Sequence, residues 1–238
     1  MLLIIAAVPL ETALLRQQLH NREVKTFSNY QIFSGTLHEV PLLIAHGGVG
    51  QNAMTLQLTR MLIHYTPQAV LLCGCGGSYP GNELKNGDLV LASEEICGDL
   101  GVATEDRFIP LEQLDIQQQP ILMPAIQQRF PLQSPWTDLA RQVLPEALFG
   151  PFVTVNCCSG HPALSTELQD RTAGICENME GAAAAQVCAA FDIPLLELRG
   201  ISNPTGTRDL LQWNIKLGAE AAQTGMLKIL QHWQREQD

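Results

Sequence analysis

The sequence predicts an α/β fold in a single domain that spans residues 1–238. Apolar runs of strand length alternate with longer stretches whose apolar residues recur at helical spacing. Such alternation is typical of a central, mainly parallel β-sheet covered by helices. A length of 238 residues suits one large domain, and 46% hydrophobic residues are enough for a core that needs neither disulfides nor metal.

The chain begins with an expected strand, helix and hairpin. Residues 2–7 are an uncharged apolar run, as in a buried strand. Residues 10–19 place four leucines on one face of a helix. Residues 30–37 and 40–46 are strand-like runs, and the His-Glu pair between them predicts the turn of a hairpin.

The alternation continues through the middle of the chain. Residues 51–65 form a helix with an apolar stripe, and residues 69–73 and 88–92 are two further strands. Residues 136–148 have helical periodicity, and residues 152–155 are strand-like.

Three elements are expected near the C-terminus. Residues 181–191 form a small-residue helix whose alanine run allows close packing on the sheet, residues 194–199 a strand, and residues 210–233 a long closing helix. Residues 98–134 are the least regular part, where a lid or a substrate-specific insertion would lie.

The charge excludes two classes of partner. A formal net charge of −10 argues against a nucleic-acid binder or a polybasic membrane anchor, both of which need clustered Lys and Arg. Nine acidic residues but two basic ones lie between Glu83 and Asp115, which indicates a solvated acidic face.

The seven cysteines lack metal-site spacing, and their odd number favours reduced thiols in a cytoplasmic protein. The apolar N-terminus lacks the basic region of a signal peptide, and no run reaches the length of a membrane-spanning helix.

Two expected strands run into glycine-rich turns. Read from Gly48, residues 48–53 fit the dinucleotide pattern G-x-G-x-x-A, but no acidic residue follows between Gln51 and Asn82 to hold a ribose, so a dinucleotide site is not expected. Gly74–Gly77 follow a buried strand, at the end of a sheet strand where ligands bind.

Five separated segments together resemble one family. They are Pro9–Glu11, Gly47–Gly50, Gly74–Gly77, Glu177–Gly181 and Arg199–Asp209, the last followed by Trp213. The chain resembles the nucleoside phosphorylase/hydrolase superfamily, and within it the futalosine hydrolases, which are relatives of the methylthioadenosine/S-adenosylhomocysteine nucleosidases. The resemblance runs from the first strand to the last helix and is weakest over residues 98–134.

The resemblance implies a twisted mixed sheet flanked by helices, in a cytoplasmic homodimer or higher homo-oligomer that uses no cofactor or metal. It implies hydrolysis of the N-glycosidic bond of futalosine, a small-molecule nucleoside, to hypoxanthine and dehypoxanthine futalosine in menaquinone biosynthesis. Glu11 would act as the general base for water, and Glu180 would accept hydrogen bonds from the ribose hydroxyls while Met179 packs against the sugar.

Position 203 departs from the adenine-releasing relatives. The resemblance implies that those relatives have an aspartate there. Asn203 carries a donor and an acceptor but is no acid, so it suits a 6-oxopurine such as hypoxanthine. An acid for the departing base would come from Asp209 or from water.

The remaining expected contacts concern the substrate's carboxylate and the lining of the pocket. Arg208 is the first candidate for the carboxylate and Arg107 the second. Gly76, Cys75 and Cys157 are expected to line the pocket, the cysteines without acting as nucleophiles.

Three alternatives remain open at this stage. A purine nucleoside phosphorylase would have an arginine two residues before Gly74, where this chain has Leu72. An adenine-releasing nucleosidase acting on methylthioadenosine, S-adenosylhomocysteine or aminofutalosine is disfavoured by Asn203. A non-catalytic nucleoside- or NAD-binding module would need neither Glu11 nor Glu180.

Overall fold

The computed structural model describes residues 1–27, 29–114 and 127–235. The strands are β1 (Leu2–Ala6), β2 (His20–Phe27), β3 (Tyr30–Leu37), β4 (Val40–His46), β5 (Val70–Ser78), β6 (Leu89–Cys97), β7 (Gly101–Ala103), β8 (Phe108–Pro110), β9 (Arg129–Pro131), β10 (Leu148–Thr154), β11 (Cys176–Asn178) and β12 (Leu195–Pro204). The α-helices are α1 (Ala13–Gln17), α2 (Gln51–His64), α3 (Pro135–Val143), α4 (Pro162–Thr172), α5 (Gly181–Ala190) and α6 (Ile215–Arg235). Three short 3₁₀ turns are η1 (Pro9–Thr12), η2 (Leu111–Gln113) and η3 (Leu210–Gln212).

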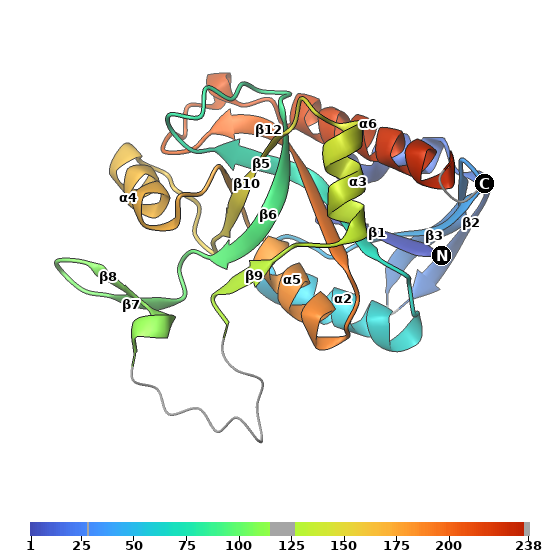
Figure 1. Ribbon diagram of the computed structural model, residues 1–238, viewed down its shortest axis with the longest axis horizontal. Coiled ribbons are helices and arrows are strands. Elements are labelled where there is room, and N and C mark those ends of the chain that lie inside the picture. The colour runs from blue at the N-terminus through green and yellow to red at the C-terminus, as the bar shows by residue number, and fades with distance from the viewer. Residues whose placement is uncertain (28, 115–126, 236–238) are drawn as a thin grey trace.

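Ten strands of the described residues form one mixed sheet with helices on both faces (Figure 1). The strand order is β11-β10-β6-β12-β5-β1-β4-β3-β2, with β9 paired to β6. Strands β1, β4, β5 and β12 run parallel to their partners in the middle, whereas β2, β3 and β9 are antiparallel. The predicted α/β class with a mixed sheet flanked by helices is confirmed.

Part of the sheet closes on itself, which alternation alone does not predict. Strand β11 pairs in parallel with β10 and also pairs antiparallel with β5, where Glu177 lies opposite Gly77. The strands β5, β12, β6, β10 and β11 therefore form a closed ring. This closure brings the segment after β11 beside the glycines of β5.

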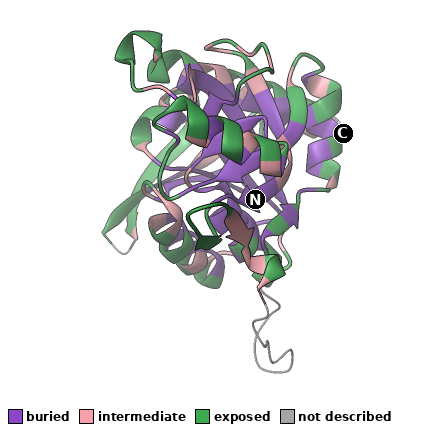
Figure 2. Ribbon diagram, turned by 90° about the vertical axis from the view of Figure 1, so that its left-hand side faces the viewer, coloured by how far each residue is buried: buried purple, intermediate pink, exposed green. Residues whose placement is uncertain are grey.

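Apolar side chains explain how the helices cover the sheet. On one face, α2 buries Met54, Leu58, Met61 and Leu62, and α5 buries its whole alanine run. On the other face, α1, α3 and α6 pack their leucine, isoleucine, methionine and tryptophan side chains against β1, β4, β5 and β12. Figure 2 shows the buried strands inside a shell of exposed helix and loop surface.

Several expected helices are shorter than their periodicity suggested. The expected helix over residues 10–19 is the turn η1 followed by the five-residue α1, and residues 20–27 then form β2, whose residues are almost all exposed. Helix α3 ends at Val143, just before Pro145, and the expected helix over residues 210–233 is broken into η3 and α6.

Two further differences lie in loops between the expected elements. Helix α4 was not expected because its buried residues are Ser165, Leu168 and Thr172, which form no clear apolar stripe. In the irregular segment, β7 and β8 form a hairpin that projects from the body of the protein (Figure 1). Residues 115–126 of the segment expected to be a lid or an insertion lie outside the described residues, whereas its last part contains β9. No helix in the described part of the chain is long and apolar enough to cross a membrane.

Candidate active site

A cavity of about 250 Å³ lies where the carboxyl ends of β5, β11 and β12 meet the turn after β1. Glu11, Glu180 and Asn203 all line it, together with Cys75, Gly76, Met179 and Arg208. Strands β5 and β12 are parallel and place their carboxyl ends at one edge of the sheet, which is where ligands bind in α/β proteins, and β11 reaches the same place through its antiparallel pairing with β5. Seven of the nine residues predicted for the site thus face one cavity.

Glu11 is held almost entirely by backbone groups. The sequence Pro-Leu-Glu-Thr forms η1, with Pro9 fixing the first turn, and leaves Glu11 only 5% exposed. Its Oε2 accepts hydrogen bonds from the N–H groups of Ala7 (3.0 Å) and Val8 (3.1 Å), and its Oε1 accepts one from Cys75 (2.8 Å). Burial raises the pKa of Glu11 above its ordinary value, against the opposing effect of Arg199.

Glu180 lies at the start of α5 and lines the same cavity as Glu11. Its Oε1 accepts a 2.9 Å hydrogen bond from the backbone N–H of Gly50, and its Oε2 lies 3.4 Å from Arg199 Nη1. Gly50 has φ +90°, a conformation that only glycine adopts readily. The glycine turn after β4 therefore serves to aim a backbone donor at Glu180.

Arg199 connects the two carboxylates, and sequence reasoning did not single it out as a site residue. It is 1% exposed on β12, and its Nη1 donates to the carbonyl oxygen of Cys75 at 3.0 Å. Burial lowers the pKa of Arg199, but the carboxylates of Glu197, Glu180 and Glu11 outweigh it, and the net pKa is raised. A lone arginine inside the apolar run Leu195–Ile201 was the signal that could have revealed it.

The glycines of β5 leave room for the carboxylate of Glu11. A Cβ built on Gly74 would lie 2.7 Å from Glu11 Oε1 and 2.8 Å from Arg199 Nη1. Burial raises the pKa of the Cys75 thiol to about 12, and the Sγ donates to the carbonyl oxygen of Ile215 at 3.3 Å. Cys75 is therefore a neutral lining group.

Asn203 lies on an irregularity of β12. The pairing of β12 with β5 shifts register between Ile201 and Asn203, so the consecutive residues Ser202 and Asn203 both line the cavity. Ser202 Oγ donates to Asn203 Oδ1 (2.8 Å), and Asn203 Nδ2 donates to the carbonyl oxygen of Pro204 (2.9 Å). One of the two Nδ2 hydrogens remains for a ligand.

The consecutive residues Arg208 and Asp209 have different places in the structure, and only Arg208 lines the cavity. The guanidinium of Arg208 lies over the ring of Trp213, 4.6 Å from its centroid, and both residues line the cavity. Asp209 is not a lining residue, contrary to the expectation, because its carboxylate caps η3 by accepting from Leu211 N and Gln212 Nε2 at 3.1 Å each. Trp213 is a lining residue that sequence reasoning noted only as part of the motif.

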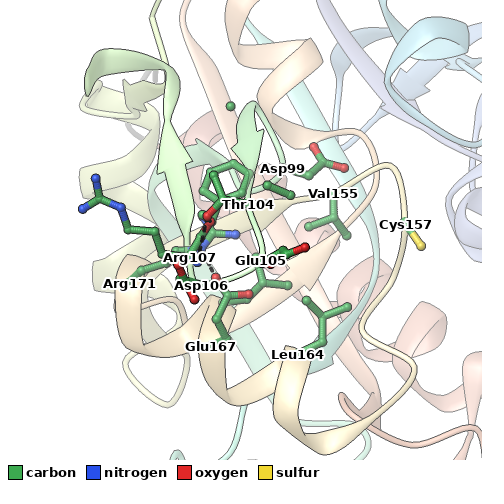
Figure 3. A pocket seen from close by; sticks show the side chains of 14 residues that line it. Asp99, Thr104, Glu105, Asp106, Arg107, Val155, Cys157, Leu164, Glu167 and Arg171 are labelled. Atoms are coloured by element: carbon green, nitrogen blue, oxygen red, sulfur yellow. Dashed lines mark hydrogen bonds and ion pairs between the residues drawn. The ribbon is translucent and has the colours of Figure 1, made fainter. Parts of the chain in front are cut away.

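Cys157 also departs from its expected place. It lines a separate cavity of about 480 Å³ between the β7–β8 hairpin and α4, together with Arg107 and Asp99 (Figure 3). Its neighbour Cys158 lines the Glu11 cavity, because consecutive side chains of this loop point in different directions. Arg107 thus lines a different cavity from Glu11, whereas Arg208 lines the candidate site.

Comparison with known proteins places these observations in a family. The family model described as the phosphorylase superfamily matches residues 2–231. A futalosine hydrolase of Thermus thermophilus is 30% identical over 77% of this chain and 78% of its own. A 5'-methylthioadenosine/S-adenosylhomocysteine nucleosidase of Mycobacterium bovis is 27% identical over 95% of each chain. The crystal structure of such a nucleosidase from Neisseria meningitidis, in complex with methylthio-immucillin-A, superposes with a TM-score of 0.84 at 19% identity, covering 97% of this chain and 98% of that one.

Proposed function

The chain belongs to the phosphorylase superfamily, and from this premise we propose that it hydrolyses the N-glycosidic bond of futalosine to hypoxanthine and dehypoxanthine futalosine, in menaquinone biosynthesis. Its similarity to nucleosidases supports a nucleosidase activity. The observation that carries the choice of substrate is Asn203 in the cavity wall, where the adenine-releasing relatives are expected to have an aspartate.

Asn203 favours a purine that presents acceptors. With Oδ1 engaged by Ser202, the free Nδ2 hydrogen is available to N7 or to the 6-oxo oxygen of hypoxanthine. An adenine would present its 6-amino donor to a group that is itself a donor. Sites that bind a base through directed hydrogen bonds reject mismatched bases strongly, since they leave buried polar groups unpaired.

Glu11 and Glu180 have different roles in the proposed reaction. Cleavage of an N-ribosidic bond passes through a positively charged, oxocarbenium-like sugar, which a nearby carboxylate stabilises. Glu11 takes a proton from the attacking water, whose oxygen forms the new bond to the anomeric carbon as the bond to the purine breaks. Glu180 accepts hydrogen bonds from the ribose hydroxyls, Met179 packs against the sugar, and water supplies the proton to the departing base.

Water is the expected nucleophile because the described residues offer phosphate little charge. The cations that line the cavity are Arg199 and Arg208. Arg199 is engaged by Glu197 and Glu180, and the residue two before Gly74 is the buried Leu72. Arg208 is left for the carboxylate at the distal end of futalosine, which a guanidinium binds in a bidentate manner.

A second candidate is an adenine-releasing nucleosidase acting on methylthioadenosine, S-adenosylhomocysteine or aminofutalosine. It is favoured by the longer match to the Mycobacterium bovis relative, over 95% of the chain against 77% for the Thermus thermophilus futalosine hydrolase. The cytoplasmic location and the homo-oligomer remain predictions of the resemblance.

Purine release from a panel of substrates tests the proposal. Futalosine, aminofutalosine, methylthioadenosine and S-adenosylhomocysteine would each be supplied to the purified enzyme, with and without phosphate, and the free purine quantified by chromatography. We expect hypoxanthine from futalosine at one rate in both buffers. Faster release of adenine from any of the other three would favour the second candidate, and a phosphate requirement would indicate a phosphorylase.

A further inference from the structure

Four carboxyl groups lie around Arg199, whose guanidinium is buried in the wall of the cavity. Glu11 and Glu180 face the cavity, whereas Glu95 on β6 and Glu197 on β12 are fully buried, each 0% exposed. All four act on Arg199 or on one another electrostatically. A single cation cannot neutralise four carboxylates, and buried charges are tolerated only when they are paired.

Glu95 and Glu197 are close neighbours in this buried cluster, and their carboxyl groups repel each other when both are ionised. Glu95 Oε1 accepts from Asn178 Nδ2 (2.7 Å), and Glu95 Oε2 accepts from Thr154 Oγ1 (2.6 Å). Glu197 Oε1 accepts from Arg199 Nε at 2.9 Å. Glu197 Oε2 is the fourth oxygen of the pair, and it has no donor among the described residues.

A proton between the two carboxyl groups supplies the missing donor. A Cβ built on Gly181 would overlap both Glu95 Oε1 and Glu197 Oε2, which shows that these two oxygens approach the same point. Burial and the neighbouring carboxyl raise the pKa of Glu95 well above its ordinary value. One shared proton satisfies Glu197 Oε2 and removes one of the excess negative charges.

The pair of Glu95 and Glu197 contacts Arg199 through Glu197. Glu197 engages Nε, so that Nη1 points to Glu180 and to the carbonyl oxygen of Cys75, whose own N–H binds Glu11. We propose that Glu95 and Glu197 share one proton, and that the pair is a positioning element that fixes Arg199 between the two carboxylates of the candidate active site. The kinetic part of this inference rests on the proposed nucleosidase function.

If the pair shares one proton, replacing either glutamate with glutamine leaves the net charge of the pair unchanged. Either Glu95→Gln or Glu197→Gln leaves one carboxylate and one donor in the pair, so each variant keeps the charge of the wild type. The double substitution leaves no carboxylate behind Arg199. We therefore expect each single variant to stay within about threefold of wild-type kcat/KM and the double variant to lose at least about tenfold, mainly through a higher KM, since Glu180 holds the ribose.

Infrared spectroscopy tests the shared proton directly and needs no substrate, so its result is independent of the proposed function. At neutral pH the wild type should show the C=O stretch of a buried protonated carboxyl, and Glu95→Gln and Glu197→Gln should each abolish it. Glu94→Gln, at the neighbouring partly exposed position, is the matched control and should keep the band. A band that survives in Glu197→Gln would mean that Glu95 is protonated on its own, and a band halved in each single variant would mean two protons.

The kinetic measurements can contradict the positioning role independently of the infrared spectra. A double variant with wild-type KM and kcat would remove the positioning role even if the proton is shared. A loss of kcat/KM in the double variant that equals the combined losses of the two single variants would also overturn the positioning role, because the shared-proton pair requires strong non-additivity. Should the double variant fail to fold, the infrared spectra and rates of the single variants still decide the proposal.

Discussion

Glu11 Oε1 accepts a 2.8 Å hydrogen bond from the backbone N–H of Cys75, which lies 64 residues further along the chain. Together with the two donors at Ala7 and Val8, this bond fixes the carboxylate through the backbone of two neighbouring strands. A carboxylate held in this way keeps its orientation without relying on flexible side chains.

Replacing Glu11 with Gln should lower kcat by about 10²–10⁴-fold, the range expected for loss of a general base. The amide also turns a donor toward backbone N–H groups, so a modest loss of stability is expected and the far-ultraviolet spectrum should confirm folding. In the wild type, burial raises the pKa of Glu11, and protonation would inactivate the proposed general base. The acid limb of kcat/KM should accordingly lie above the ordinary pKa of a glutamate. A Glu11→Gln variant with wild-type kcat would exclude this role.

Asn203→Asp should shift the enzyme toward adenine nucleosides, because a carboxyl can protonate N7 and accept from the 6-amino group. We expect the ratio of kcat/KM for futalosine to that for aminofutalosine to fall at least about tenfold. Asn29→Asp, which adds the same charge in the turn between β2 and β3, serves as the control. Equal ratios in the Asn203 variant and in the wild type would contradict the proposed selectivity.

Arg208→Ala should raise KM for futalosine about tenfold while leaving the hydrolysis of inosine, which has no carboxylate, nearly unchanged. Arg107→Ala is the paired control, since Arg107 lines the separate cavity beside the β7–β8 hairpin. An effect of Arg107→Ala alone, or an equal effect of Arg208→Ala on both substrates, would disprove the assignment. Initial rates over a range of each substrate measure these constants.

Gly74→Ala should displace the catalytic carboxylate without altering any reacting group. The added methyl would meet Glu11 Oε1 at 2.7 Å and Arg199 Nη1 at 2.8 Å, so one of the two must move. A misplacement on this scale costs about 10²-fold in rate. Gly160→Ala is the control, because the nearest atom to its added methyl is 3.9 Å away. Rates of purine release from both variants compare them, and a Gly74 variant as active as the control would show that Glu11 has room to shift.

His46 should make the protein less stable in mild acid. One of its ring nitrogens lies 2.7 Å from Thr12 Oγ1, and burial, with a smaller effect of Arg16, lowers its pKa to about 4. The unfolded chain therefore binds the proton first, and stability is lost as the pH falls from about 6.5 toward 4. Urea unfolding should show a loss of about 1–2 kcal/mol at pH ~5 relative to pH ~7.5.

His46→Gln should remove that part of the pH dependence, whereas the exposed His20→Gln should retain it. An identical pH dependence in the wild type and in His46→Gln would show that other groups are responsible.

The class of fold and most of the candidate site were predictable because their signals are local. Apolar runs mark β1, β4 and β5, the glycines of the motifs lie in the last part of β5 or just after β4, and Glu11 and Glu180 lie within a few residues of the ends of β1 and β11. The edge strand β2 was missed because its side chains are exposed. The ring closed by β11 depends on the pairing of Glu177 with Gly77, supported by a side-chain hydrogen bond from Tyr79 to Glu177 across 98 residues of chain, and local patterns do not encode such contacts.

The less predictable residues are those whose partners are distant in the sequence. Glu95 lies in the acidic stretch that was expected to be a solvated face, yet it is fully buried beside Glu197 and Thr154. Asp209 and Cys157 belong to or adjoin motifs but face away from the cavity, since local capping and the direction of a loop decide where each side chain points.

The register shift in β12 separates the specificity of the enzyme from the integrity of its core. Asn203 stands at the irregular position, whereas Leu198 and Ile201, earlier on the same strand, are buried in the packed interior. A substitution at position 203 is therefore expected to change which base the cavity accepts without disturbing the packing of Leu198 and Ile201. If Asn203 selects the base as proposed, a single point mutation would suffice to change the preference between 6-oxo and 6-amino purines, without compensating changes elsewhere in the sheet.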